Sequence, residues 1–242
     1  MVNRPSVKLK AAILAGGLGA RLRSVVSDSP KPMAVVGGKP FLVYLLEWLR
    51  KQGIHEVVLC VGYRWQDIHA VLGDGASLNM RLQYSVENAP LGTGGALKNA
   101  QIFLQDTFLA LNGDSFVDID LKKLVEFHRR KESIATLALT HVTDTGAYGA
   151  VDLNDQGKIR NFTEKQGPGA PAGWVNAGVY VLEPDVLSLI PGGKPVSLEQ
   201  DVFPELVKRN YPIYGFCVKG YFIDIGTPEA YFQSQSELER KI

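Results

Sequence analysis

The clearest candidate for a phosphate-binding site in this sequence is a glycine-rich segment that is followed by two cationic residues. The run Leu14-Ala15-Gly16-Gly17 continues to Gly19, and Arg21 and Lys31 follow it. Glycines let backbone N–H groups approach phosphate oxygens without a side-chain clash. Arg and Lys supply positive charge in two geometries that suit phosphate. The segment therefore predicts a site for a triphosphate whose α-phosphorus must become electrophilic.

This segment differs from two common phosphate-binding motifs. A P-loop ends in Gly-Lys-Ser/Thr, which is missing here. The dinucleotide fingerprint requires a third glycine at the position of Leu22, and prolines interrupt the stretch that follows. A P-loop NTPase and a nicotinamide-dependent dehydrogenase are both disfavoured.

Two aspartates that each follow a short apolar stretch are candidate metal ligands. Asp114 comes after the run from Phe108 to Asn112, and Asp224 comes after a second apolar run and before Gly226. Open α/β sheets bind ligands at the carboxyl ends of their strands. Mg²⁺ prefers few carboxylates, together with water and substrate phosphates. The two aspartates can therefore converge on one hard cation.

The elements that must position these residues follow from the hydrophobic periodicity. Over the first 143 residues the pattern predicts strands at 11–15, 56–61, 81–86, 108–112 and 134–140. It predicts helices at 41–52, 66–72, 94–104 and 121–131. Strands that alternate with helices indicate a parallel sheet covered by helices.

The pattern changes after about residue 143. Strands are predicted at 150–153, 159–164, 175–182, 213–218 and 221–223, with helices at 198–208 and 228–240. No linker separates the two parts, so we expect one domain over residues 1–242 with one continuous sheet. The expected fold is α/β and Rossmann-like, with a mixed, mostly parallel sheet. A nucleotide-binding half spans about 1–143 and a mixed half about 144–242.

The composition is typical of a globular protein. Of 242 residues, 45% are hydrophobic and 21% are charged, and the net charge is +1. That charge creates no bulk attraction for nucleic acid or an anionic membrane. The apolar run after the first ten residues is too short for a signal peptide or a membrane span, so we expect a cytoplasmic protein. Cys60 and Cys217 are expected to be buried, reduced thiols.

Further motifs follow the glycine-rich segment in a fixed order. They are Pro30-Lys31-Pro32-Met33, Leu91-Gly92-Thr93-Gly94-Gly95, Asn112-Gly113-Asp114, Glu164-Lys165, Asn176-Ala177-Gly178 and Asp224-Ile225-Gly226-Thr227. This set resembles the signature of the sugar-phosphate nucleotidyltransferases over essentially the whole chain. Within that family, the stretch 22–28 and the short length resemble the D-glycero-D-manno-heptose 1-phosphate guanylyltransferases.

The resemblance implies the fold of the nucleotide-diphospho-sugar transferases and a role for each motif. It implies Mg²⁺ as cofactor, held by Asp114 and Asp224, and catalytic roles for Arg21, Lys31 and Asp114. It implies a nucleotide site formed by Leu14, Ala15, Gly16, Gly17, Gly19, Glu87, Gly92, Thr93 and Gly113. In the half at about 144–242 it implies a sugar-phosphate site formed by Tyr148, Gly149, Glu164, Lys165, Asn176 and Gly178. The implied partners are an NTP and a sugar 1-phosphate, without nucleic acid or membrane, and assembly into a homo-oligomer is left open.

Glu87 bears on the choice of base, because the family contacts the base with this segment. A carboxylate only accepts hydrogen bonds. Guanine presents two adjacent donors, N1–H and N2–H₂, whereas uracil presents one donor between two acceptor oxygens. The residue therefore favours GTP over UTP or dTTP.

The expected mechanism is direct, in-line attack by an oxygen of the sugar phosphate on the α-phosphorus. A phosphate monoester is already anionic near neutral pH, so no general base is needed. Catalysis then consists of positioning and charge neutralisation.

Other functions stay open at this point. They include a mannose 1-phosphate guanylyltransferase, a uridylyltransferase for another sugar 1-phosphate and a non-catalytic subunit that senses nucleotide-sugars. The presence of Lys31, Asp114 and Asp224 favours an enzyme over the last of these.

Overall fold

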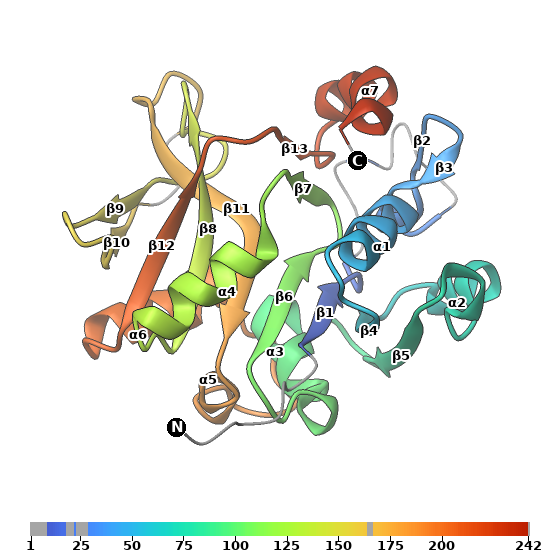
Figure 1. Cartoon of the computed structure of the whole chain (residues 1–242), viewed down its shortest axis with the longest axis horizontal. Helices are drawn as coiled ribbons and strands as arrows, with labels where there is room; N and C mark the ends of the chain where they lie inside the picture. The colour runs from blue at the N-terminus through green and yellow to red at the C-terminus, as the bar shows by residue number, and fades with distance from the viewer. Residues whose placement is uncertain (1–8, 18–21, 23–28, 164–166, 242) are drawn as a thin grey trace.

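The computed structural model describes residues 9–17, 22, 29–163 and 167–241. A seven-stranded sheet with the order β12-β8-β11-β6-β1-β4-β5 crosses the molecule (Figure 1). Its strands are β1 (Lys10–Leu14), β4 (Glu56–Val61), β5 (Arg81–Val86), β6 (Phe108–Asn112), β8 (Ala135–Val142), β11 (Gly173–Leu182) and β12 (Ile213–Val218). Every neighbouring pair is parallel except for β11, which runs antiparallel to both β6 and β8. The predicted mixed, mostly parallel sheet is confirmed.

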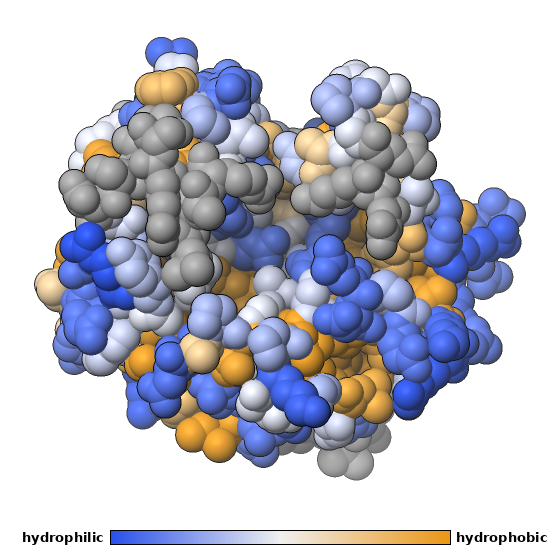
Figure 2. Space-filling view, turned by 180° about the vertical axis from the view of Figure 1, so that it is seen from behind, coloured by the Kyte–Doolittle hydropathy of each residue, from blue (hydrophilic) through white to orange (hydrophobic). Residues whose placement is uncertain are grey.

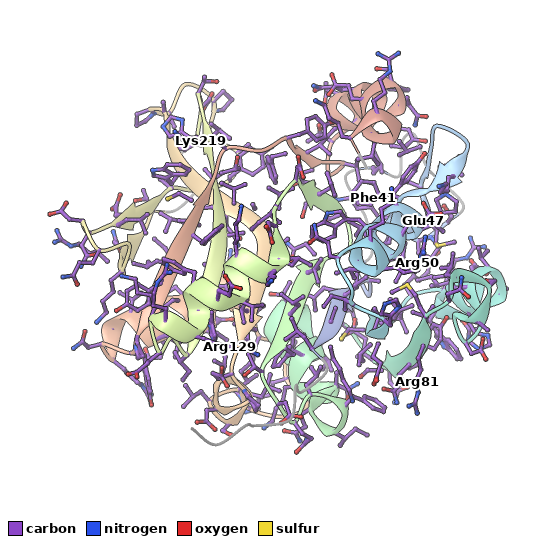
Figure 3. All side chains as sticks on the ribbon, in the orientation of Figure 1. Phe41, Glu47, Arg50, Arg81, Arg129 and Lys219 are labelled. Atoms are coloured by element: carbon purple, nitrogen blue, oxygen red, sulfur yellow. The ribbon has the colours of Figure 1, made fainter. Side chains whose placement is uncertain are left out.

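Helices cover both faces of the sheet. On one face, buried side chains of α1 (Phe41–Lys51), α2 (Trp65–Leu72) and α4 (Leu121–Arg130) belong to one apolar cluster. On the other face, α3 (Gly92–Asn99), α5 (Asp185–Ser188) and α6 (Phe203–Lys208) contribute to a second cluster. Helix α1 illustrates the cause, because its leucines recur at helical spacing and Phe41, Leu45 and Leu49 are buried against the sheet. In Figure 3, Phe41 lies inside the molecule, whereas Arg81, Arg129 and Lys219 lie on the outside.

Three small two-stranded ladders complete the fold. They are β2 (Val35–Val36) with β3 (Lys39–Pro40), β7 (Ser115–Val117) with β13 (Phe222–Asp224), and β9 (Val151–Leu153) with β10 (Ile159–Phe162). The last helix, α7 (Pro228–Glu237), packs near β2, where Tyr231 donates a hydrogen bond to the carbonyl of Val35 at 2.7 Å. Among the described residues, no helix combines the length and the apolar character that crossing a membrane would require.

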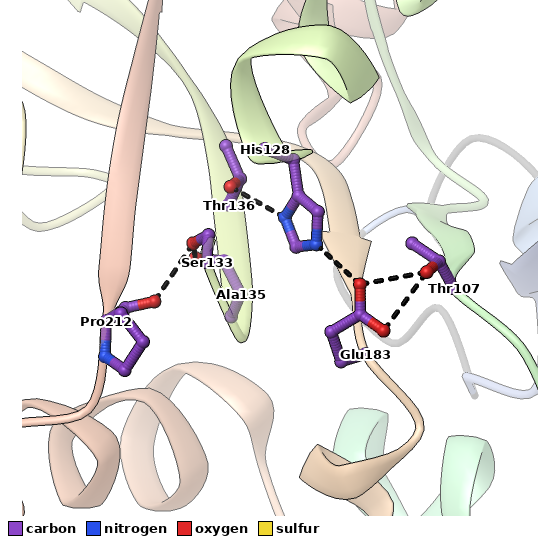
Figure 4. A network of polar contacts seen from close by, with 7 residues as sticks. All are labelled: Thr107, His128, Ser133, Ala135, Thr136, Glu183 and Pro212. Carbon is purple, nitrogen blue, oxygen red and sulfur yellow. Dashed lines mark hydrogen bonds and ion pairs between the residues drawn. The ribbon is translucent and has the colours of Figure 1, made fainter. Parts of the chain in front are cut away.

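A polar network ties α4 to the ends of the interior strands β6, β8 and β11 (Figure 4). The buried ring of His128 contacts Thr136 Oγ1 through Nδ1 and Glu183 Oε1 through Nε2, both at 2.9 Å. Thr107, at the start of β6, donates to the same Glu183 carboxylate. The hydrogen bond from His128 is the main reason that the pKa of Glu183 is lowered. This network lies at the amino-terminal end of β6, the end opposite Asp114.

Two expectations from the sequence need correction. Cys217 is exposed rather than buried, since β12 is an edge strand and leaves that side chain uncovered. The single helix expected at 198–208 is a π-helical turn, η5 (Leu198–Val202), followed by α6. Pro204 explains the change: it has no N–H for the carbonyl of Gln200 and its ring crowds that carbonyl. The helix therefore widens, and Phe203 N–H bonds Leu198 O, five residues back.

Candidate active site

Lys31 lies between the two aspartates that the sequence proposed as metal ligands. Its Nζ is 2.5 Å from Asp114 Oδ2 and 3.9 Å from Asp224 Oδ1. The lysine side chain is only 10% exposed, whereas the two aspartates are 32% and 28% exposed. The carboxylates therefore converge on one cationic position that is open to solvent on their side.

The ladder between β7 and β13 brings these two aspartates together. Asp114 occupies the short connection from β6 to β7, and Asp224 is the last residue of β13. Asp224 pairs with Ser115, and Ile225 N–H donates to the carbonyl oxygen of Asp114 at 2.9 Å. The backbone N–H of Gly226 holds Asp224 Oδ1 at 2.7 Å. Backbone pairing thus fixes two side chains that are more than a hundred residues apart in the chain.

These residues fit a divalent cation. The ammonium group of Lys31 already stands where the two carboxylates meet, which marks the position as favourable for positive charge. Among the described residues, no group of three or more His, Cys, Asp and Glu side chains could hold a metal ion. A pair of carboxylates matches the preference of Mg²⁺ for few protein ligands with water and phosphate oxygens.

The start of the glycine-rich segment lies beside this cluster. Ala15 N–H donates to Cys60 O at the end of β4, and Gly113 N–H donates to Leu14 O. A Cβ at Gly113 would lie 2.6 Å from Leu14 O, so the backbones approach closely. Gly17 has open space where a side chain would be. Gly19 and Arg21 lie outside the described residues.

Glu87 lies against the glycine-rich segment, although it follows a different strand. Its N–H continues the β5 ladder to Val61 O, and its carboxylate packs over Gly16 and Gly62. A Cβ at Gly16 would lie 2.5 Å from Glu87 Oε1, so any larger residue there would displace the Glu87 carboxylate. Leu91 N–H donates to Oε2 at 3.2 Å. Burial raises the pKa of Glu87 above its ordinary value.

Gly92 and Thr93 begin helix α3, which starts two residues earlier than expected. The φ of Gly92 is +70°, and a Cβ there would collide with Val196 O. Gly94 N–H and Gly95 N–H both donate to the same carbonyl of Val196. The segment around Val196 therefore holds the amino-terminal turn of α3 in place.

The described residues of the proposed sugar-phosphate site begin with Asn176 and Gly178, which lie at the same end of the strands as the cluster. In β11, Asn176 Oδ1 accepts from Gly178 N–H at 2.9 Å, in a strand whose register shifts between Asn176 and Tyr180. Such a bulge redirects side chains at functional sites. Gly178 has a φ of +75° and lies against Asn112 and Ser115, next to Asp114.

Tyr148 stacks edge-on against Phe222 of β13, with ring centroids 5.8 Å apart, and Gly149 follows it. Because Phe222 is two residues before Asp224, this contact links the loop before β9 to the strand that carries Asp224. Glu164 and Lys165 lie outside the described residues.

Three polar residues in this region received no role from the sequence, although Asn112 stood in one of the motifs: Asn112, Tyr180 and Glu199. Tyr180 is fully buried and its hydroxyl contacts both Asn176 and Glu199. Asn112 Oδ1 is buried without a hydrogen-bond partner among the described residues. A tyrosine within the apolar run of β11 and an Asn directly before Gly113-Asp114 were the available signals. Glu199 offered none, because it resembles any acidic residue near a helix start.

The surface is hollowed over this region. Figure 2 shows a depression at the upper centre of the face seen from behind, between one projection that carries α7 and another at the tips of β8 and β11. In Figure 1, β7 and β13 lie between the same two projections. The two projections therefore border an open cleft, and the strands β7 and β13 lie between them.

Comparisons with known proteins agree with this arrangement. The model of the family "Nucleotidyl transferase" matches residues 10–241. The chain is 38% identical to a mannose-1-phosphate guanylyltransferase of Mycobacterium tuberculosis, over 97% of this chain and 66% of that protein. It is 40% identical to a D-glycero-alpha-D-manno-heptose 1-phosphate guanylyltransferase of Campylobacter jejuni, over 93% of this chain and 97% of that protein.

A solved structure is also similar: HddC from Yersinia pseudotuberculosis complexed with GMP-PN. It superposes with a TM-score of 0.83 at 34% identity, over 95% of this chain and 99% of that one. The family match spans nearly all of the chain, and the fold agrees with it. This chain belongs to the nucleotidyl transferase family.

Proposed function

We propose that this chain is a guanylyltransferase that joins GTP to D-glycero-α-D-manno-heptose 1-phosphate and releases pyrophosphate. The observation that carries the proposal is the convergence of Lys31, Asp114 and Asp224 beside the start of the glycine-rich segment. Nearly full-length similarity to a heptose 1-phosphate guanylyltransferase supports the choice of substrates. A cytoplasmic location remains a prediction, and assembly into a homo-oligomer remains open.

The reaction needs little more than positioning and charge. An oxygen of the sugar phosphate attacks the α-phosphorus of GTP, and the bond from that phosphorus to the bridging oxygen of pyrophosphate breaks. Lys31, with Arg21 from the glycine-rich segment, neutralises phosphate charge as this happens. Nucleotidyltransferases of this kind generally use a divalent metal. Asp114 and Asp224 would hold Mg²⁺, which supplies positive charge beside the α-phosphate when bound.

Glu87 supports guanine as the base. Its carboxylate is half-buried over Gly16 and Gly62, and within the described parts of the chain Leu91 N–H donates a hydrogen bond to it. Lone pairs on both oxygens remain for the adjacent N1–H and N2–H₂ donors of guanine. The carbonyl oxygens of uracil or thymine would face the same negative charge and would be repelled.

Tyr148, Gly149, Asn176 and Gly178 supply the described part of the sugar-phosphate site. They lie on two segments that both reach the carboxylate cluster, through Phe222 and through Asn112 and Ser115. Glu164 would accept from ring hydroxyls and Lys165 would bind the sugar phosphate. The attacking phosphate would then lie beside the α-phosphate of the bound nucleotide.

Release of pyrophosphate across a panel of substrates tests this proposal. GTP, ATP, UTP and dTTP are each combined with the 1-phosphates of D-glycero-α-D-manno-heptose, α-D-mannose and α-D-glucose, with Mg²⁺ present. We expect the largest kcat/KM for GTP with the heptose 1-phosphate. A preference for UTP or dTTP would overturn the choice of base, and no release with any pair would overturn the proposal.

A mannose 1-phosphate guanylyltransferase is the second candidate. The Mycobacterium relative supports it, at 38% identity over 97% of this chain. Mannose and the heptose share the configuration of the ring and differ in the arm at C5. In the same panel, a larger kcat/KM for α-D-mannose 1-phosphate with GTP would favour this candidate.

A further inference from the structure

Glu199 collects hydrogen bonds from three hydroxyl groups. It lies in η5, and its Oε1 accepts from Tyr180 at 3.0 Å. Its Oε2 accepts from Thr93 at 2.8 Å and from Ser197 at 3.0 Å. Thr93 lies in the proposed nucleotide site, and Tyr180 contacts Asn176 of the proposed sugar site. One carboxylate thus reaches both binding sites.

The direction of each of these hydrogen bonds is fixed. A hydroxyl group has one proton, and each of these three also accepts a hydrogen bond from an N–H group. Asn176 Nδ2 donates to the Tyr180 hydroxyl, Leu198 N–H donates to Thr93 Oγ1, and Gln200 N–H donates to Ser197 Oγ. Each hydroxyl therefore directs its proton to Glu199, whose two carboxyl oxygens act as the acceptors.

On the sugar side, this network sets the orientation of Asn176. Its Oδ1 is held by Gly178 N–H, and its Nδ2 donates to Tyr180 at 2.7 Å. One N–H of the amide is left to face a substrate. Tyr180 is fully buried, and burial together with the charge of Glu199 raises its pKa well above the ordinary value, so it remains a donor.

On the nucleotide side, the same network holds the first turn of α3. Thr93 is bonded to both Glu199 and Leu198 N–H. The carbonyl of Val196 accepts from Gly94 and Gly95, and Val196 N–H donates to Leu91 O. The segment from Val196 to Glu199 therefore braces the loop that is expected to contact the base.

We propose that Glu199 is a positioning residue that orders the nucleotide loop and the sugar-binding amide of Asn176 at the same time. This inference rests on the proposed function for the identity of the two ligands. Glu199 itself touches neither ligand and acts through Thr93 and Tyr180. Substrate affinity on both sides of the cleft therefore depends on one carboxylate.

Three substitutions test the proposal in the full chain. Glu199→Gln puts an N–H₂ donor where hydroxyl protons converge, so we expect KM for GTP and KM for the sugar 1-phosphate each to rise about tenfold. Tyr180→Phe removes only the sugar branch, so only KM for the sugar 1-phosphate should rise, by about three- to tenfold. Thr93→Val removes only the nucleotide branch, so the increase should be in KM for GTP. Glu205→Gln, the same change on the exposed side of α6, is the matched control and should leave both constants within twofold.

The pattern of effects separates positioning from general loss of structure. A merely structural role would lower the thermal midpoint and the fraction of active enzyme. It would not raise KM for the sugar 1-phosphate alone in Tyr180→Phe and KM for GTP alone in Thr93→Val. Unchanged KM values in Glu199→Gln, or an increase in KM for GTP in Tyr180→Phe, would overturn the proposal. If Glu199→Gln does not fold, the proposal is tested by the other two variants. Tyr180→Phe should raise only KM for the sugar 1-phosphate, and Thr93→Val should raise only KM for GTP.

Equilibrium binding separates this inference from the proposed function. Should the wild-type chain release no pyrophosphate, the proposed function fails, and Kd values for GTP and for the sugar 1-phosphate are measured by calorimetry. A higher Kd for the sugar 1-phosphate in Tyr180→Phe only, and a higher Kd for GTP in Thr93→Val only, would still support positioning by Glu199. Equal Kd values in wild type and all three variants would overturn it.

Discussion

At the scale of single residues, charge balance dominates the site. Asp114 faces the ammonium of Lys31 at 2.5 Å, and Asp224 faces it from the other side at 3.9 Å. Asp114→Asn keeps the shape of the side chain but removes the charge expected to bind the metal. We expect kcat to fall by about 10²–10³-fold, while Lys31 keeps Asp224 as a partner and the fold persists. Pyrophosphate release and the thermal midpoint measure the two effects.

Asp106→Asn is a suitable control for this variant. Asp106 is exposed and precedes the same strand, β6, at its other end. Its substitution should leave kcat within twofold. Turnover of Asp114→Asn within threefold of wild type would exclude Asp114 from the catalytic site.

The raised pKa of Glu87 predicts a pH dependence for nucleotide binding. Burial raises this pKa, so the carboxylate becomes protonated at a higher pH than an ordinary glutamate. Protonation removes acceptor capacity that the proposal assigns to guanine. KM for GTP should therefore rise as pH falls through that raised pKa, in addition to any effect of phosphate protonation.

Glu87→Gln isolates this contribution, because it keeps the titration of the nucleotide phosphates and removes the carboxylate. Its KM for GTP should exceed that of wild type by about tenfold at pH 8, and the two curves should converge in acid. A constant ratio of the two KM values across pH would show that Glu87 does not titrate in contact with the base.

At the scale of elements, the network around His128 predicts a structural effect that is separate from catalysis. Glu183 accepts from His128 and Thr107, and its pKa is lowered. A lowered pKa stabilises the folded state above the unfolded pKa, and this contribution is lost as pH falls through the folded value. Because Glu183 is partly exposed, Glu183→Gln should cost only about 1 kcal/mol at pH 7.

Thermal unfolding at several pH values measures this cost, which corresponds to about 2–4 °C for a chain of this size. The difference between wild type and Glu183→Gln should disappear below the lowered pKa. A difference that grows in acid would contradict the assignment. The KM values should not change, since the network lies at the opposite end of β6 from Asp114.

Most large elements could be predicted from the sequence because each has a clear apolar pattern. The expected bounds of β4, β5, β6 and β12 match those of the structure, since polar or turn residues flank these apolar runs. The strands β2, β3 and β7 were not predicted, and of the ladder β7–β13 only β13 was. Strands of two or three residues are too short to show a hydrophobic period. The π turn before α6 depends on one proline inside a helical pattern, which predicts a break without giving its form.

At the scale of the whole molecule, the sequence predicted only those residues of the candidate site that belong to recognisable motifs. Lys31, Asp114 and Asp224 were foreseen and lie together in the structure. The contact between Glu87 and Gly16 and the three hydrogen bonds to Glu199 were not foreseen. Most of these contacts join residues that are far apart in the chain, such as Thr93 and Glu199, and one sequence alone does not show which distant residues meet.

Because Asp114 and Asp224 are proposed to hold Mg²⁺, we expect pyrophosphate release and GTP binding to depend on a divalent metal. Chelation with EDTA should abolish pyrophosphate release, and added Mg²⁺ should restore it. GTP at about 100 times its Kd should stabilise the fold by about 2.7 kcal/mol, or about 5–10 °C in the thermal midpoint. This shift should be much smaller without the metal. Full turnover in EDTA would contradict a metal held by Asp114 and Asp224.

The three-residue ladder between β7 and β13 has a consequence for how the protein matures during synthesis. All seven strands of the central sheet have left the ribosome once Val218 has emerged, yet the second acidic group arrives six residues later. A nascent chain can therefore complete the strands of its scaffold before it acquires the second acidic group of the charge centre.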